Sequence, residues 1–379
     1  MLERIYFSQN GEMFTYVWED STFFFYVSFL FVVLFLGNVV QRGDYSVNKV
    51  IIIFIFIYLY IFCGFRDTTV GRDTEMYTDI FNDSKEWSNI SDWGVEPGFF
   101  LLNKIFHLFV GYEKLGVPIF AFITYFLIFK TIYKYSLSIN IQATLYLLVC
   151  IGFYLQSFDL LRISLATSIE LYFFHYVIEK QYYKYFIVLL CCLTIHYSTL
   201  LMFIPLISLI LFRKNPLFFL AVIGVMIVVA TFVISHLEFF IFFARYEHYT
   251  MEDVDKIGIG PAQFVYNLPI LALAFYVYKK KYGSHDVLQI LFVYCVICFI
   301  YGLVGYFVPV GRTTIHFLMI YVLLIPYCLA QLKVNNDKYY RIIYLICIVY
   351  GVVRYHYYLV GYLYSDGIMP YRMLNLFAS

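Results

Sequence analysis

Long apolar runs separated by short polar turns dominate the chain. The runs approach the twenty or so residues that a helix needs to cross the hydrocarbon core of a bilayer. They therefore predict an all-α, polytopic membrane protein with one domain over residues 1–379. We expect about twelve spans, at roughly residues 22–40, 47–65, 116–133, 140–157, 162–178, 184–196, 198–212, 217–236, 263–279, 287–305, 314–332 and 342–362.

Two apolar stretches do not fit a full crossing. Residues 98–112 must form an outer-surface or re-entrant helix, because a span there would move Lys130 and Lys134 to the outer side. Residues 184–212 are short for two crossings, so half-length or tilted helices should meet near His196.

Composition agrees with a membrane protein and removes several classes of function. Apolar residues make up 63% of the chain and charged residues 13%. A net charge of +1 lacks the basic footprint of a nucleic-acid-binding protein. The eight cysteines lie in apolar runs without metal-ligand spacing, which favours packing roles. The expected cytoplasmic turns are short and no phosphate-binding G-x-x-x-x-G-K-[ST] motif occurs, so we expect no nucleotide. No metal site is visible in the sequence, and we expect no other cofactor.

Lysine and arginine are distributed differently along the chain. Threading the spans by the positive-inside tendency places 11 of 15 lysines in cytoplasmic turns, with both termini and residues 66–115 and 237–262 outside. An arginine kept on the outer side suggests bidentate recognition of phosphate or carboxylate, although ordinary ion pairs are the alternative. Eight of eleven arginines lie there: Arg4, Arg66, Arg72, Arg162, Arg245, Arg312, Arg354 and Arg372.

The segment after the second expected span carries several polar groups. Gly71 permits a sharp turn, Arg66 emerges near headgroup depth, and Asp73 and Tyr77 are one helical turn apart. The segment could clamp a lipid phosphate while a carboxylate contacts a sugar hydroxyl. A helix cap with a surface ion pair is the alternative.

A second group lies near the fifth expected span. Arg162 stands at a helix N-terminus, where it opposes the helix dipole unless an anion is near. Glu170 lies two turns deeper on the same face, at hydrocarbon depth, where ionisable groups usually face the bundle interior. The alternative is an Arg162–Asp159 ion pair with Glu170 in a structural role.

His196 lies between two short apolar helices on the outer side and is a candidate general base. We rank it above Asp73 and Asp159, which have arginines nearby to pair with. A hydrogen-bonded packing histidine is the alternative interpretation. Arg312 opens another expected span, in the same geometry as Arg162.

These residues, in this order, resemble the Wzy-type polysaccharide repeat-unit polymerases, specifically the EpsG-like branch. The chain has one more residue between Arg66 and Gly71 than that pattern. The matching positions are Arg66/Gly71/Asp73/Tyr77, Glu96-Pro97-Gly98, Arg162/Ala166, Ile195-His196-Tyr197-Ser198, Arg312 and Pro370-Tyr371.

The resemblance implies a metal-independent, GT-C-like membrane glycosyltransferase of the bacterial inner membrane. It would transfer a growing glycan from undecaprenyl diphosphate to the terminal sugar hydroxyl of a new lipid-linked unit, making O-antigen, capsule or exopolysaccharide. Membrane lipids, a chain-length regulator and a flippase are the further partners that it implies. The expected catalytic residues are His196, Asp73 and Asp159, and the expected substrate-binding residues are Arg66, Arg72, Tyr77, Glu96, Arg162, Glu170, Arg245, Arg312, Tyr371 and Arg372.

Other membrane functions stay open at this point. A flippase or transporter for lipid-linked sugars should carry charged residues on both faces and an internal repeat, and neither is visible. A glycan ligase would use similar chemistry on a different acceptor. An O-acyltransferase would need a buried histidine and an acyl-carrier entry on the cytoplasmic side, where this chain has little.

Overall fold

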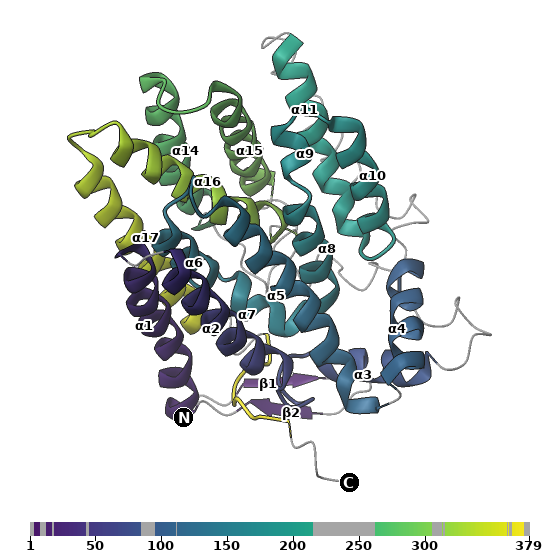
Figure 1. The fold of residues 1–379 in the computed structure, drawn as a ribbon. Helices are drawn as coiled ribbons and strands as arrows, with labels where there is room; N and C mark the ends of the chain where they lie inside the picture. The colour runs from purple at the N-terminus through teal and green to yellow at the C-terminus, as the bar shows by residue number, and fades with distance from the viewer. Residues whose placement is uncertain are drawn as a thin grey trace.

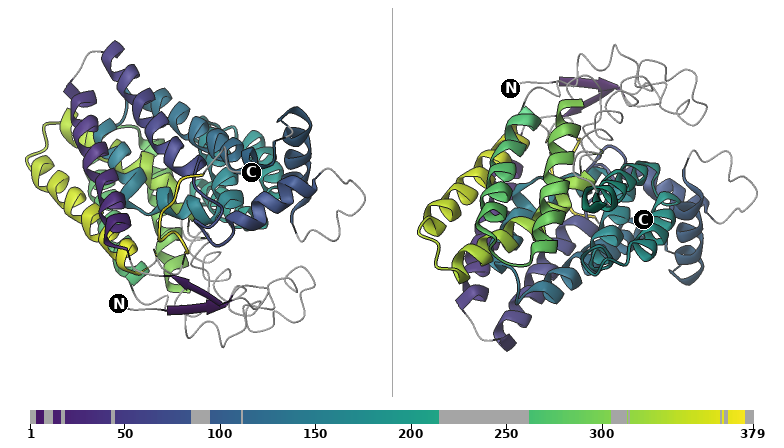
Figure 2. Two further views of the ribbon diagram at one scale, coloured as in Figure 1. Left: turned by 90° about the horizontal axis from the view of Figure 1, so that it is seen from below. Right: turned by 90° about the horizontal axis from the view of Figure 1, so that it is seen from above.

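The computed structural model describes residues 4–7, 13–16, 19–42, 45–84, 95–110, 112–214, 262–304, 313, 315–361, 363 and 366–374. These residues form a bundle of helices packed side by side (Figures 1 and 2). In chain order the elements are β1 (Arg4–Phe7), β2 (Met13–Tyr16), α1 (Asp20–Arg42), α2 (Tyr45–Gly64), α3 (Thr74–Asp83), α4 (Pro97–Val110), η1 (Glu113–Leu115), α5 (Gly116–Tyr135), α6 (Ile141–Cys150), α7 (Phe153–Asp159), α8 (Leu161–Tyr172), α9 (His175–Ile178), α10 (Tyr182–Leu193), η2 (Tyr197–Met202), α11 (Phe203–Lys214), α14 (Ala262–Lys280), α15 (His285–Val304), α16 (Ile315–Val334) and α17 (Tyr340–Gly361).

Two helices form the centre of the bundle. α6 packs against α1, α16 and α17, and nearly all side chains of α6 and α16 are buried. The outer helices α1 and α17 instead expose large apolar side chains, among them Phe24, Phe35 and Leu345. Water-soluble proteins rarely expose apolar surface on this scale, so the arrangement is compatible with a protein that contacts lipid.

Length and composition identify the helices that can cross a membrane. Among the described residues, four helices qualify: α1, α5, α16 and α17. α6 and α7 qualify together as a fifth, bent by 41°. The bend lies at Gly152, whose φ of +91° is favourable only for glycine. The span expected at 140–157 is therefore broken in the middle.

Most of the expected spans coincide with helices, but among the described residues only these four helices, and the bent pair as a fifth, have the length and composition of a crossing. Short helices α10 and η2–α11 meet around His196, as the sequence predicted, and α4 is a separate short helix over the stretch expected at 98–112. The run at 217–236 lies outside the described residues. The described residues are helical, as expected, apart from one short element: β1 and β2 form an antiparallel hairpin. Its aromatic and β-branched residues favour extended backbone.

Turns that carry lysine gather at one end of the bundle. Lys180, after α9, lies 2.9 Å from Asp286 at the start of α15. Tyr276 and Tyr282, at the end of α14, donate hydrogen bonds to Asp337 between α16 and α17. α3 and tail residues 366–374 lie at the opposite end, at the bottom of Figure 1. The fold therefore separates the turns around Lys180 and Lys338 from the segment around Arg66, whereas Lys114, in η1, lies beside α3.

This separation predicts that Asp83 and Lys338, both exposed, lie on opposite sides of a membrane. We expect D83C and K338C, each in a C191S background, to react with an impermeant maleimide from opposite sides of sealed vesicles. The background removes the exposed native thiol. Labelling in detergent is the control for reactivity. Labelling of both positions from the same side would contradict the arrangement.

Candidate functional site

The C-terminal tail closes one end of the bundle. Residues 366–374 run beside the segment that follows α2, and Tyr371 donates a hydrogen bond to the carbonyl of Phe62 at 2.9 Å. The expected binding residue Tyr371 therefore holds the tail, and the side chain of Arg372 is exposed. Main-chain hydrogen bonds that join the tail to this segment include Asp67 N to Arg372 O at 2.9 Å, Gly71 N to Gly367 O at 2.8 Å, Arg72 N to Asp366 O at 3.3 Å and Leu374 N to Phe65 O at 2.8 Å.

Arg66 is buried and its guanidinium faces oxygen atoms of the protein itself. Nε donates to the carbonyl of Val70 at 3.2 Å, and Nη2 donates to the carbonyl of Phe158 at 2.5 Å and to Thr74 Oγ1 at 3.3 Å. Nη1 donates to the carbonyl of Cys63. Direct contact with a phosphate, which the sequence suggested for Arg66, is disfavoured because its donors are already occupied. The side chain instead fixes the shape of the segment.

Gly71 makes the turn that follows. Its φ is +93°, and a Cβ atom there would lie only 2.6 Å from the carbonyl oxygen of Phe158. Only glycine fits both the backbone conformation and the space. The turn places Arg72 and Asp73 beside Asp159 at the end of α7.

Arg72 and three carboxyl groups form a cluster at this turn. Arg72 Nη2 lies 3.3 Å from Asp159 and 3.6 Å from Asp366 in the tail, and the backbone N–H of Asp73 donates to Asp159 Oδ1 at 3.2 Å. The Arg72 side chain is 36% exposed, whereas that of Asp159 is 1% exposed. The alternative Arg162–Asp159 pair was wrong, because Asp159 pairs with Arg72.

Glu96 joins three segments through its two carboxylate oxygens. Oε2 lies 2.5 Å from Arg162 at the start of α8, and Oε1 accepts a hydrogen bond from the backbone N–H of Tyr197 at 3.1 Å. Pro97 and Gly98 follow and begin α4. Proline is well suited to the first position of a helix, and Gly98, which has no side chain, lets the backbone of α4 contact Thr194 in the turn before η2. The Glu96-Pro97-Gly98 motif thus brings a carboxylate to Arg162.

Arg162 is partly open to solvent. Its side chain is 17% exposed, and its guanidinium lies over the rings of Tyr77 and Phe99, at 5.7 and 5.9 Å from their centroids. Its Nε is buried and has no hydrogen-bond partner within the part of the chain that the structure describes. This arginine is therefore held in place by Glu96 and the two rings and still has a donor without a partner.

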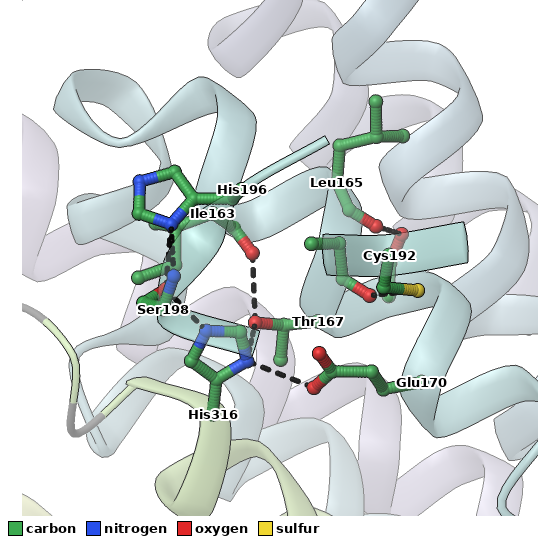
Figure 3. A network of polar contacts seen from close by, with 10 residues as sticks. Ile163, Leu165, Thr167, Glu170, Cys192, His196, Ser198 and His316 are labelled. Atoms are coloured by element: carbon green, nitrogen blue, oxygen red, sulfur yellow. Dashed lines mark hydrogen bonds and ion pairs between the residues drawn. The ribbon is translucent and has the colours of Figure 1, made fainter. Parts of the chain in front are cut away.

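A chain of hydrogen bonds runs inward from His196 (Figure 3). His196 Nδ1 lies 2.6 Å from Ser198 Oγ, which lies 2.7 Å from His316 Nε2. His316 Nδ1 lies 2.8 Å from Glu170 Oε2 and 3.1 Å from Thr167 Oγ1. His316 and Glu170 are fully buried, whereas His196 and Ser198 are half-buried.

Sequence reasoning found Glu170 but missed its partner. His316 is an ionisable residue near the start of the apolar helix α16, and such residues inside predicted spans are themselves a signal of function. Ser198 was part of a motif but received no role. Neither partnership follows from spacing, because His316 lies 146 residues from Glu170.

Electrostatics link these groups into one site. Burial raises the pKa of Asp73, while the cations of Arg72 and Arg162 oppose the rise. The positive charge of Arg162 also interacts electrostatically with the His196 ring. Among the described residues, no group of three or more His, Cys, Asp or Glu side chains could hold a metal ion. Arg245 and Arg312 lie outside the described residues. We call the connected residues the polar belt: Arg72, Asp73, Glu96, Asp159, Arg162, Glu170, His196, Ser198, His316 and Asp366.

Comparison with known proteins identifies one family. The model of the EpsG family matches residues 49–373, a range that contains the whole polar belt. No curated protein and no solved structure matches the chain.

The contacts of Arg66 predict that its replacement affects stability. R66Q leaves carbonyl groups without donors, so we expect the free energy of unfolding to fall by at least about 2 kcal/mol. The measurement is thermal unfolding in detergent, together with protease sensitivity of the tail. R372Q, which changes an exposed arginine of the tail, is the matched control and should behave as the wild type. Unchanged stability of R66Q would mean that Arg66 does not hold the segment.

Proposed function

The chain belongs to the EpsG family, and on this premise we propose that it polymerises lipid-linked oligosaccharide repeat units. The family indicates a membrane-embedded, glycosyltransferase-like polysaccharide polymerase. In our proposal, a GT-C-like enzyme of about twelve spans works in the bacterial inner membrane with its polar belt facing outward. The lysine-bearing turns at the other end of the bundle support this orientation.

The reaction defines what the site must supply. The hydroxyl oxygen of the acceptor sugar forms a bond to the anomeric carbon of the donor glycan, and the bond from that carbon to the lipid diphosphate breaks. The hydroxyl proton must go to a base, and the diphosphate leaves with added negative charge. The site therefore needs cations near the leaving group and a proton acceptor near the hydroxyl.

Arg162 is the residue that carries this proposal. It is partly exposed, its Nε donor has no partner among the described residues, and it lies in electrostatic reach of both Asp73 and His196. A guanidinium fixed by Glu96 and two aromatic rings is preorganised to stabilise a developing diphosphate charge. We propose Arg72, and from the resemblance Arg245 and Arg312, as further contacts of the diphosphate or glycan. In this proposal no metal ion is required.

The three candidates for the base differ in their surroundings. Asp159 is buried in its pair with Arg72, so it is the least accessible. Asp73 is half-buried at the start of α3 and can accept a hydrogen bond from an acceptor sugar. His196 is half-buried and connects to further titratable groups. We therefore propose His196 as the base and Asp73 as a carboxylate that orients the acceptor.

The test of the function is the glycan ladder of cells that lack this protein. We expect long chains to disappear while one repeat unit on lipid remains. Accumulation of the lipid-linked unit on the cytoplasmic side would instead favour a flippase, and polymer that stays on its lipid carrier would favour a ligase.

R162K tests the role of Arg162. Lysine keeps the charge but loses the planar donor fork, so we expect elongation to fall roughly tenfold or more, equivalent to about 1.5–3 kcal/mol for a charge-assisted contact. The measurement is the initial rate of elongation at equal protein level. R354K is the matched control, because Arg354 stacks on Tyr266 away from the belt. Wild-type elongation by R162K would exclude a diphosphate contact.

The pKa of Asp73 gives a prediction for the pH profile. Activity that needs ionised Asp73 is present above its pKa and is lost as the pH falls through that value. R72Q removes a cation that lowers the pKa. We therefore expect the acid limb of the elongation profile to move to higher pH in R72Q and to stay in place in R354Q. The movement should be absent when R72Q is combined with D73N. An unmoved limb in R72Q would mean that the ionisation of Asp73 does not set the acid limb.

A further inference from the structure

Three side chains of the polar belt have no role in the function proposed above. Ser198, His316 and Glu170 extend inward from His196 through successive contacts of 2.6, 2.7 and 2.8 Å (Figure 3). We propose that they form a proton relay, which carries the charge gained by His196 to a buried His316–Glu170 pair. The inference rests on the proposed function, since that reaction supplies the proton from the acceptor hydroxyl.

The hydrogen-bond partners fix where the protons lie at both ends of the chain. The backbone N–H of Ser198 donates to His196 Nδ1 at 3.1 Å, so this nitrogen is an acceptor and the proton of His196 is on Nε2. Thr167 Oγ1 donates to the carbonyl of Ile163, so it can only accept from His316 Nδ1. His316 Nδ1 therefore carries a proton, which it shares with Glu170.

The serine hydroxyl connects these two ends. With His196 Nδ1 as acceptor, Ser198 Oγ–H points to His196, and Ser198 Oγ accepts from His316 Nε2–H. His316 then holds protons on both nitrogens and forms an ion pair with the Glu170 carboxylate. The structure thus has the geometry of the relay after a proton has been taken up.

The state before uptake differs by two transferred protons and one added proton. In that state Nε2 of His196 is bare, and its Nδ1–H donates to Ser198 Oγ, so Nδ1 no longer accepts the hydrogen bond of the Ser198 backbone N–H. Ser198 Oγ–H donates to His316 Nε2. When Nε2 takes the hydroxyl proton, the Nδ1 proton passes to Oγ and the Oγ proton passes to His316. One proton enters, no bond other than those to hydrogen changes, and the positive charge appears on His316.

The relay places the charge where it is best balanced. A positive charge left on His196 would be opposed by the guanidinium of Arg162, whereas a charge on His316 faces the carboxylate of Glu170. The charged and titratable groups that face the relay are Arg162 and Glu96 near His196, and Tyr185, Cys192 and Tyr294 near Glu170.

A Ser–His–Glu sequence of contacts also occurs in hydrolases that use serine as a nucleophile. In this chain, however, Ser198 Oγ is bonded on both sides, at 2.6 Å to His196 and at 2.7 Å to His316. This places the hydroxyl inside the network and not at its end. The experiment must therefore distinguish a relay through Ser198 from a nucleophilic attack by Ser198.

The experiment uses the full-length protein in lipid nanodiscs with a lipid-diphosphate-linked repeat unit. We expect S198A to lower kcat for elongation by roughly 10²-fold with KM nearly unchanged, and S198T, which keeps the hydroxyl, to restore most of it. Equal thermal unfolding of the S198A and S198T proteins controls for folding. Elongation by S198A within about twofold of a working wild type would overturn the relay.

The pH profile separates a relay from a packing role. The base must be unprotonated, and Glu170 stabilises the protonated relay. E170Q should therefore move the acid limb to lower pH, and it should cause no further movement in an S198A background. A uniform loss of rate with no movement of the limb would mean that Glu170 only packs.

Two further measurements separate a failure of the relay from a failure of the proposed function. A fluorophosphonate that inactivates the wild type by labelling Ser198 would overturn the relay in favour of a nucleophilic serine. A wild-type protein that binds the lipid-linked unit but never elongates it would instead overturn the proposed function.

Discussion

The carboxylate of Glu96 is the constraint on which the geometry of the site depends. It is buried, and its two oxygens serve Arg162 and the backbone N–H of Tyr197. Without this carboxylate, Arg162 would oppose the dipole of α8, and loss of one partner from such a pair typically costs about 3–5 kcal/mol. Tyr197 lies between His196 and Ser198. One carboxylate therefore orients both the arginine of the proposed clamp and the turn that begins the proposed relay.

The arginines at the end of the bundle that holds α3 and the tail have different roles, although the sequence predicts the same outer location for all of them. Arg66 donates to backbone carbonyls and holds the segment against the tail. Arg72 and Arg162 keep part of their guanidinium groups accessible while carboxylates fix their position. A buried arginine whose donors are all hydrogen-bonded within the protein has none left for a ligand. A partly exposed arginine that a carboxylate holds in place is preorganised to bind one. The difference lies in neighbours that come from distant parts of the chain.

Much of the fold could be predicted from apolar runs, because their length and bounds depend on local composition. The half-length helices at His196 and the separate helix α4 were predicted in this way and are confirmed. The family resemblance, carried by motifs such as Glu96-Pro97-Gly98, is confirmed as well. The side-chain pairings were not predictable. Asp159 pairs with Arg72 although Arg162 is nearer in sequence, and His316 pairs with Glu170 from another part of the chain. Such pairs follow from helix packing and not from spacing. The hairpin of β1 and β2 was missed because each strand is only four residues long.

The measurement that tests the central claim most directly is a polymerisation reaction with purified protein. Wild-type protein in nanodiscs is given a lipid-diphosphate-linked repeat unit with its glycan and its lipid labelled separately, in the presence of a chelator. The account predicts that free lipid diphosphate appears in step with a ladder of longer lipid-linked glycans. Glycan and lipid labels that stay joined in single repeat units, under conditions where the protein binds them, would contradict it.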